Sequence, residues 1–197
     1  PAIVTGKPLN IGGSQGRKEA TGRGTIVCMV EALKERGEFD PSNIKLAVQG
    51  FGNVGSHAAA YAASLGFKIV AATDITGGVY NPDGLDIAAL RAYVAETGYI
   101  RGYAEGDVIT NSELIGVPCD VLIPAAMENQ ITEKKPAPVT ASQTREGTNA
   151  PTTPQADDIL RDKGVTLVPD ILANAGGVIV SYFEWVQDLQ AFAWDED

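Results

Sequence analysis

Short apolar runs alternate with helix-like repeats along most of the chain. Apolar runs bounded by turn-forming residues, which are typical of strands buried on both faces of a parallel sheet, occur at residues 44–49, 67–72, 121–124 and 165–168. Apolar positions at helical spacing predict helices at residues 25–36, 56–65, 85–96, 157–163 and 177–190. This alternation predicts an α/β fold with a doubly wound, mostly parallel sheet and helices on both faces.

The two ends of the chain differ from this pattern. Residues 1–24 are rich in glycine and proline, which predicts an N-terminal segment of tight turns. Residues 177–197 form a C-terminal helix carrying Tyr182, Phe183 and Trp185, which we expect in the core. No repeat or linker divides the chain, so we expect one domain over residues 1–197. It begins without methionine, and we expect it to be a piece of a longer protein.

Composition excludes several kinds of protein. The 197 residues are 44% hydrophobic, enough for one core, and no apolar run is long enough to cross a bilayer. The amino terminus lacks the basic and hydrophobic segments of a signal peptide. A net charge of −10 disfavours nucleic acid as a partner, because phosphate binding needs a cationic surface. We therefore expect no membrane or nucleic-acid partner.

Histidine and cysteine are too scarce for two common kinds of site. The chain has His57 as its single histidine and two cysteines, Cys28 and Cys119. A Cys/His zinc site or a Ser-His-Asp triad needs more of these residues, so we expect no metal site. We expect His57 to be a partly packed surface imidazole and both cysteines to be small buried residues. Two unpatterned cysteines suit a reducing cytoplasm.

A G-x-G-x-x-G pattern lies between a predicted strand and a predicted helix, at residues 50–55. Gly50 would allow the tight turn, Gly52 the approach of a pyrophosphate, and Gly55 close packing of helix on strand. The first turn of the helix would offer free N–H groups to the phosphates. Because an ordinary strand-to-helix turn needs no such set of glycines, this segment predicts a Rossmann-type dinucleotide site.

Asp74 ends the second predicted strand, 19 residues beyond Gly55. A carboxylate there can accept hydrogen bonds from the adenosine ribose and would repel the 2′-phosphate of NADP. This favours NAD, with NADP as the alternative. Asp74 can instead serve to begin the turn at residues 76–78.

Several further blocks carry a family resemblance. They are residues 5–8 (TGKP), 12–14 (GGS), 19–24 (EATGRG), 49–55 (QGFGNVG), 80–84 (YNPDG), 151–154 (PTTP), 169–181 (PDILANAGGVIVS) and 183–187 (FEWVQ). With them, nearly the whole chain resembles the NAD(P)-binding domain of the hexameric glutamate dehydrogenases, in the Glu/Leu/Phe/Val dehydrogenase family. The regions around Gly12 and Asn174 resemble the glutamate branch more than the others.

The resemblance implies oxidative deamination of L-glutamate to 2-oxoglutarate and ammonia, with hydride transfer to NAD(P), by a homohexamer. It implies cofactor-binding roles for Thr21, Gly50, Phe51, Gly52, Asn53, Val54, Gly55, Asp74, Asn129, Asn149 and Asn174. It implies substrate-binding roles for Arg17, Val178 and Ser181. The family's catalytic lysine and aspartate belong to a preceding domain, so we expect this chain alone to bind dinucleotide without turning over glutamate.

Plainer roles for some of these residues stay open. Thr21 and Ser181 can bond to their own helices, and Asn174 can be the N-cap of the last helix in addition to lining the cofactor cleft. Arg17 can be structural or intersubunit. For the whole chain, the alternatives are a leucine, phenylalanine or valine dehydrogenase, and a non-catalytic dinucleotide-binding module.

Residues 134–146 depart from the family pattern. Where the family has a buried apolar strand, this chain has the polar run TASQTRE at residues 140–146. Such a run fits the middle of a parallel sheet poorly. Either the sheet is irregular there or the recorded sequence is wrong in this stretch, and we favour the second explanation because the blocks on both sides are intact.

Overall fold

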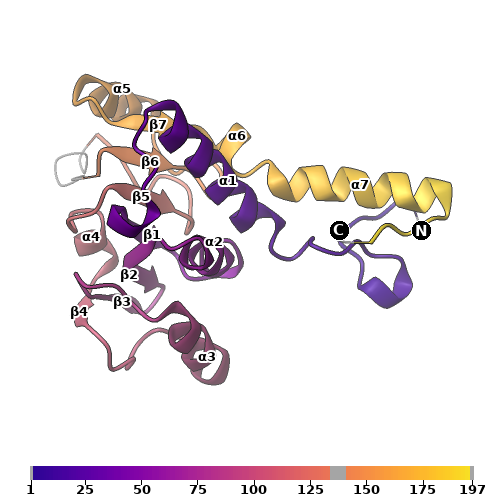
Figure 1. Ribbon diagram of the computed structural model, residues 1–197, viewed down its shortest axis with the longest axis horizontal. Coiled ribbons are helices and arrows are strands. Elements are labelled where there is room, and N and C mark those ends of the chain that lie inside the picture. The colour runs from indigo at the N-terminus through magenta and orange to yellow at the C-terminus, as the bar shows by residue number, and fades with distance from the viewer. Residues whose placement is uncertain (1, 134–140, 196–197) are drawn as a thin grey trace.

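The computed structural model describes residues 2–133 and 141–195, which build a seven-stranded sheet in the order β4-β3-β2-β1-β5-β6-β7 (Figure 1). The strands are β1 (Lys45–Gln49), β2 (Lys68–Asp74), β3 (Gly77–Tyr80), β4 (Asp107–Ile109), β5 (Val121–Pro124), β6 (Gln143–Arg145) and β7 (Thr166–Val168). All neighbours pair in parallel except β3, which is antiparallel to β2 and β4. The α/β, mostly parallel fold is confirmed.

Helices lie on both faces of the sheet (Figure 1). They are α1 (Ala20–Glu35), α2 (Asn53–Ser64), α3 (Ile87–Thr97), α4 (Asn111–Leu114), α5 (Pro154–Asp162), α6 (Asp170–Ala173) and α7 (Gly176–Gln190). The five predicted helices are present. The four-residue α4 and α6 were not predicted, because so few residues show no periodicity. Among the described helices, none has the length and apolar character to cross a membrane.

Strict alternation along the central strands produces two cores. In β1, Leu46 and Val48 pack into the core beneath α1 and α2, whereas Ala47 packs into the core on the opposite face. In β5, Ile123 belongs to the first core and Leu122 to the second. Successive side chains of a strand point to opposite faces, so a strand covered on both sides must be apolar throughout.

The start of α1 differs from the prediction. The helix begins at Ala20, so Gly22 and Gly24 lie within it instead of in turns. A Cβ at Gly22 would lie 2.5 Å from the carbonyl oxygen of Val54 in α2, and one at Gly24 would lie 3.1 Å from the Cα of Gly176 in α7. These glycines therefore let α1 pack closely between two other helices, and that need outweighs their low helix propensity.

Three short strands were missed. The segment Gly77–Tyr80 was expected to begin with a turn, yet it forms β3, and a Cβ on Gly78 would collide with the carbonyl oxygen of Ala72 in β2. Its partner β4 is an edge strand of three residues. The strand β6 pairs with β5 and β7 although its residues are polar and buried, so the sheet continues through residues 143–145. Residues 134–140 lie outside the described part.

The last helix projects from the sheet. Figure 1 shows α7 extending away from the strands, with the N-terminal segment of the chain beside it. Tyr182, Phe183 and Trp185 are exposed along it, so their expected place in the core is wrong. The buried stripe of α7 carries Glu184 and Gln187 instead. We call α7 together with residues 2–19 the arm.

Candidate functional site

The glycine-rich turn follows β1 directly, and its three motif glycines meet different constraints. Gly50 has φ +91°, and a Cβ on it would lie 2.7 Å from the backbone of Ala126. A Cβ on Gly55 would collide with the carbonyl oxygen of Gly50, so only glycine allows α2 to start this close to the strand. At Gly52, by contrast, a Cβ would meet no atom within 4 Å. Packing therefore explains two of these glycines, and Gly52 faces open space.

A cavity of about 430 Å³ opens beside this turn. Its lining includes Gly50, Phe51 and Gly52 from the turn, together with Asp74, the last residue of β2, and Ile75, which follows it. The cavity thus lies at the carboxyl ends of neighbouring parallel strands, where ligands bind in open α/β sheets. Its volume falls in the range of small-molecule sites, and its wall is mostly apolar, with a few polar groups.

Asp74 both lines this cavity and holds the turn that follows it. Its Oδ1 accepts hydrogen bonds from the backbone N (2.7 Å) and Oγ1 (2.6 Å) of Thr76, and its Oδ2 accepts one from the backbone N of Ile100 (2.7 Å). Asp74 therefore does hold a turn, but that turn lies at residues 75–76, because Gly77 and Gly78, which were expected in it, belong to β3. No lysine or arginine belongs to the described lining of this cavity.

A second cavity, of about 400 Å³, brings together residues that lie far apart in the sequence. Its lining includes seven of the predicted residues: Arg17, Thr21, Val54, Asn149, Asn174, Val178 and Ser181. The Nδ2 of Asn174 donates to the Oδ1 of Asn149 at 2.7 Å. Asn174 is the C-cap of α6, while Ala175 is the N-cap of α7, so the expected N-cap role of Asn174 is wrong. Its amide is engaged across the cavity instead.

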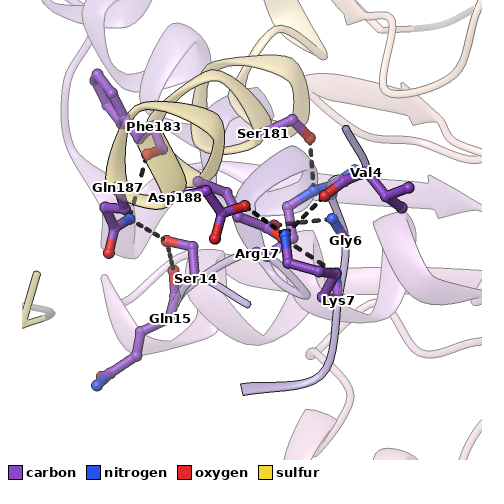
Figure 2. A network of polar contacts seen from close by, with 11 residues as sticks. Val4, Gly6, Lys7, Ser14, Gln15, Arg17, Ser181, Phe183, Gln187 and Asp188 are labelled. Atoms are coloured by element: carbon purple, nitrogen blue, oxygen red, sulfur yellow. Dashed lines mark hydrogen bonds and ion pairs between the residues drawn. The ribbon is translucent and has the colours of Figure 1, made fainter. Parts of the chain in front are cut away.

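Arg17 and Ser181 contact each other at the edge of this cavity (Figure 2). The Nε of Arg17 donates to the Oγ of Ser181 at 2.9 Å, and that Oγ donates to the carbonyl oxygen of Gly177 at 3.0 Å. Ser181 therefore does bond to its own helix, as its plainer role predicted. Arg17, which lines the cavity, uses its Nε for this hydrogen bond. Its two terminal guanidinium nitrogens take no part in the contact with Ser181.

Two predicted cofactor residues lie elsewhere. Asn53 begins α2 and lines a third cavity, together with Arg17 and Lys18, and its Nδ2 donates to the carbonyl oxygen of Lys18 at 3.1 Å. Asn129 is exposed with φ +55°, and its backbone N donates to the carbonyl oxygen of Ala150 at 3.0 Å. It lines none of these three cavities.

Sequence reasoning missed several residues of the first cavity, among them Tyr99, Asn111 and Met127. Each lies in a loop or at the start of a short helix, well away in sequence from the glycine turn. One signal was available: Thr110 and Glu113 form a capping box, which predicts a helix beginning at Asn111. Nothing in the sequence places that helix beside Asp74.

The remaining titratable candidates lie outside these cavities. His57 is partly buried on α2, as expected, and burial followed by the charge of Arg91 lowers its pKa. Cys28 and Cys119 are free and half-buried, so they are less buried than expected. Burial raises the pKa of both thiols, that of Cys119 to about 12. No group of three or more metal-binding side chains occurs within residues 2–133 and 141–195.

Comparison with known proteins places the chain in a family. Residues 12–197 match the Glutamate/Leucine/Phenylalanine/Valine dehydrogenase family. The chain belongs to this family. It is 53% identical over 196 residues to glutamate dehydrogenase of Thermotoga maritima, covering 99% of this chain and 47% of that relative. It is 49% identical over 197 residues to the catabolic NAD-specific glutamate dehydrogenase RocG of Bacillus subtilis, covering all of this chain and 46% of the relative.

Two further matches, one sequence and one solved structure, are also glutamate dehydrogenases. NADP-specific glutamate dehydrogenase A1 of Halobacterium salinarum is 50% identical over 199 residues, covering all of this chain and 47% of that protein. The structure of the hetero-hexameric glutamate dehydrogenase from Thermus thermophilus (Leu bound form) superposes with a TM-score of 0.90 at 38% identity, covering 98% of this chain and 45% of the other. The chain is thus homologous to glutamate dehydrogenases and spans about half of their length.

Proposed function

We propose that this chain is the NAD(P)-binding domain of a glutamate dehydrogenase, whose full-length form deaminates L-glutamate oxidatively to 2-oxoglutarate and ammonia. The observation that carries the proposal is Gly52, which faces open space at the start of α2 beside a cavity that extends to Asp74. When bound, the nicotinamide accepts the hydride from the α-carbon of the amino acid.

The glycine turn is suited to hold the pyrophosphate. Gly52 is the N-cap of α2 and carries no side chain that could accept from the first turn. The N–H groups at the start of α2 have no partner within the helix, and the positive end of the helix dipole lies there too. A phosphate group over Gly52 would accept from these N–H groups.

The second cavity is suited to the nicotinamide and the amino acid. Thr21, Asn149 and Asn174 offer hydroxyl and amide groups that can orient a carboxamide, and Arg17 and Ser181 can bind a carboxylate. Its described lining contains no lysine, aspartate or glutamate that could act as a base. Because deamination needs a base within hydrogen-bond reach, we propose that the preceding part of the protein supplies it and that this chain alone is inactive.

For the cofactor we propose NAD in preference to NADP. A 2′-phosphate would lie near the Asp74 carboxylate, and no lysine or arginine in the described lining of the cavity offsets the repulsion. Relatives of similar identity include one NAD-specific and one NADP-specific enzyme, so overall identity does not decide the cofactor. Calorimetric titration of the chain with both dinucleotides tests this preference, and tighter binding of NADP would contradict it.

Gly52→Ala tests the site directly. Its φ of −79° and ψ of −155° are accessible to alanine and its Cβ would meet no atom, so the fold should persist. The methyl group would lie where the pyrophosphate approaches, and we expect NAD affinity to fall at least about tenfold by calorimetry. Ser56→Ala, in the same helix, is the matched control and should retain NAD affinity. Unchanged affinity of folded Gly52→Ala would contradict the proposal.

The reaction itself is tested on the full-length protein. We propose a homohexamer acting on glutamate. The Thermus relative is a hetero-hexameric glutamate dehydrogenase, which supports the number of six subunits. Steady-state rates with glutamate, leucine and phenylalanine should favour glutamate, and light scattering should give six subunits. A preference for leucine would assign the protein to another branch of the same family.

A further inference from the structure

Asn111 lines the first cavity near Asp74, and its side-chain amide has a defined orientation. Its Nδ2 donates to the backbone carbonyl oxygen of Asp74 at 2.7 Å. Because a carbonyl oxygen can only accept a hydrogen bond, the NH2 end of the amide must face Asp74. The Oδ1 end therefore faces away from Asp74, and within the described part of the chain it receives no hydrogen bond.

Other hydrogen bonds hold the backbone of both partners in this contact, Asn111 and Asp74. Thr110 caps α4: its Oγ1 accepts from the backbone N of Glu113 at 3.2 Å, while the Oε2 of Glu113 accepts from the backbone N of Thr110 at 2.7 Å. Asp74 is tied through its carboxylate to Thr76 and Ile100. The acceptor atom of Asn111 is thus held in place before any ligand binds, which reduces the entropy lost on binding.

Apolar side chains line the same cavity as Asn111. Ile75 is 85% exposed and Met127 is 68% exposed, although both line the cavity, and Tyr99 lines it too. Exposed apolar side chains in a cavity favour a flat, apolar ligand group such as a nucleobase. With the pyrophosphate proposed at Gly52, the base of the dinucleotide would lie toward Asp74 and Asn111, at the ends of other strands.

We propose that Asn111 determines the specificity of the cavity for adenine, by accepting a hydrogen bond at Oδ1 from the exocyclic amine of the base. This inference rests on the proposed dinucleotide binding. A purine with a 6-oxo group would place an acceptor against the Oδ1 acceptor, leaving two polar atoms unpaired in a partly apolar site. Sites built on a hydrogen bond discriminate strongly against analogues that lack the partner atom.

Calorimetry with NAD and with nicotinamide hypoxanthine dinucleotide, which carries the 6-oxo group, measures this preference. We expect the wild-type chain to bind NAD about tenfold more tightly than the analogue. Asn111→Ala should weaken NAD binding and reduce the ratio to about twofold or less. Ser112→Ala changes an exposed side chain of the same helix that does not line the cavity, so it is the matched control and should keep the ratio near that of the wild type.

Two results would overturn the inference and leave the proposed function intact. One is equal binding of the two dinucleotides by the wild type, a measurement that requires no variant to fold. The other is an unchanged ratio in folded Asn111→Ala. Failure of both dinucleotides to bind the wild type would instead contradict the proposed function, and this inference with it.

Discussion

The sheet and the arm are stabilised in opposite ways. In the sheet, the buried residues of β1 and β5 are mostly apolar, and Leu46 is fully buried. In the arm, the fully buried residue of α7 is Glu184, while Leu189 is 61% exposed. Burial of apolar surface therefore stabilises the sheet, whereas directed polar contacts define the arm.

The polar contacts of the arm centre on Lys7 and Glu184. Figure 2 shows Lys7 beside Asp188 in this network. The Nζ of Lys7 lies 2.6 Å from the Oε1 of Glu184 and 2.7 Å from the Oδ2 of Asp188. The Oε2 of Glu184 also accepts from the backbone N of Gly6 at 2.8 Å. The hydrogen bonds to Asp188 and Glu184 raise the pKa of Lys7. The N-terminal residues are therefore held on α7 by ion pairs and hydrogen bonds to carboxylates, not by an apolar core.

Leu46→Ala should have the largest effect, because it removes apolar contacts from the fully buried centre of the sheet. We expect the free energy of unfolding to fall by about 3 kcal/mol, measured by urea denaturation. Leu189→Ala makes the same chemical change on the exposed side of the arm and should alter it by less than about 0.5 kcal/mol. If the two variants lost similar free energies of unfolding, the sheet and the arm would not differ in how they are stabilised.

Arg145→Val tests strand β6, the one described strand of the sheet whose buried residues are all polar or charged. Arg145 is fully buried in β6, its Nε has no acceptor, and no salt bridge joins it to a carboxylate of the described residues. Burial, followed by the charge of Arg36, lowers its pKa to about 10. The terminal nitrogens of the guanidinium donate to the carbonyl oxygens of Thr144 and Thr166 and to the Oε1 of Gln143, but none of these acceptors is charged. Since replacing a buried charge that has no charged partner with an apolar residue relieves its desolvation, we expect a gain of about 2 kcal/mol by urea denaturation.

The control for this variant is Arg161→Val, which removes an exposed arginine paired with Asp158 and should change stability by less than about 0.5 kcal/mol. A loss of stability in Arg145→Val would show that the arginine is well accommodated.

Peptide mass spectrometry over residues 134–147 tests our proposal that the recorded sequence is wrong there, and finding the polar run in the protein would refute it.

Glu184→Gln should have a local effect, confined to the arm. We expect the backbone amides of Gly6 and Lys7 to lose about tenfold of their protection in hydrogen exchange, because the charged acceptor is removed. Glu31→Gln breaks an exposed ion pair with Lys34 and serves as the control. Unchanged protection in Glu184→Gln would show that the carboxylate does not hold the N-terminal residues.

The same carboxylate gives the arm a pH dependence. Burial pushes the pKa of Glu184 up, but the hydrogen bonds from Lys7 and from the backbone of Gly6 outweigh this and leave the pKa below its ordinary value. A lowered folded-state pKa means that the stabilisation is present above the ordinary carboxyl pKa and is lost as the pH falls through the lowered value. Protection of Gly6 should therefore decline in acid in the wild type, and much less in Glu184→Gln.

The sequence predicted the elements whose signals are local. Strands β1 and β5 could be recognised because both of their faces are apolar, and the glycine turn because it joins a strand to a helix. The start of α1 could not, since Gly22 and Gly24 favour turns until α2 and α7 are packed against them. The exposure of Trp185 was also unpredictable, because helical spacing shows that a face exists without showing what covers it.

For the candidate site, the sequence by itself determined the glycine turn, the carboxylate at the end of β2 and the family, because these depend on residues close together in the chain. The tertiary structure decided which distant groups join them. Asn111 reaches Asp74, and Asn174 reaches Asn149, only because parallel strands and the loops that follow them end at one edge of the sheet. Contacts of that kind depend on where strands pair and helices pack, which no local pattern of residues specifies.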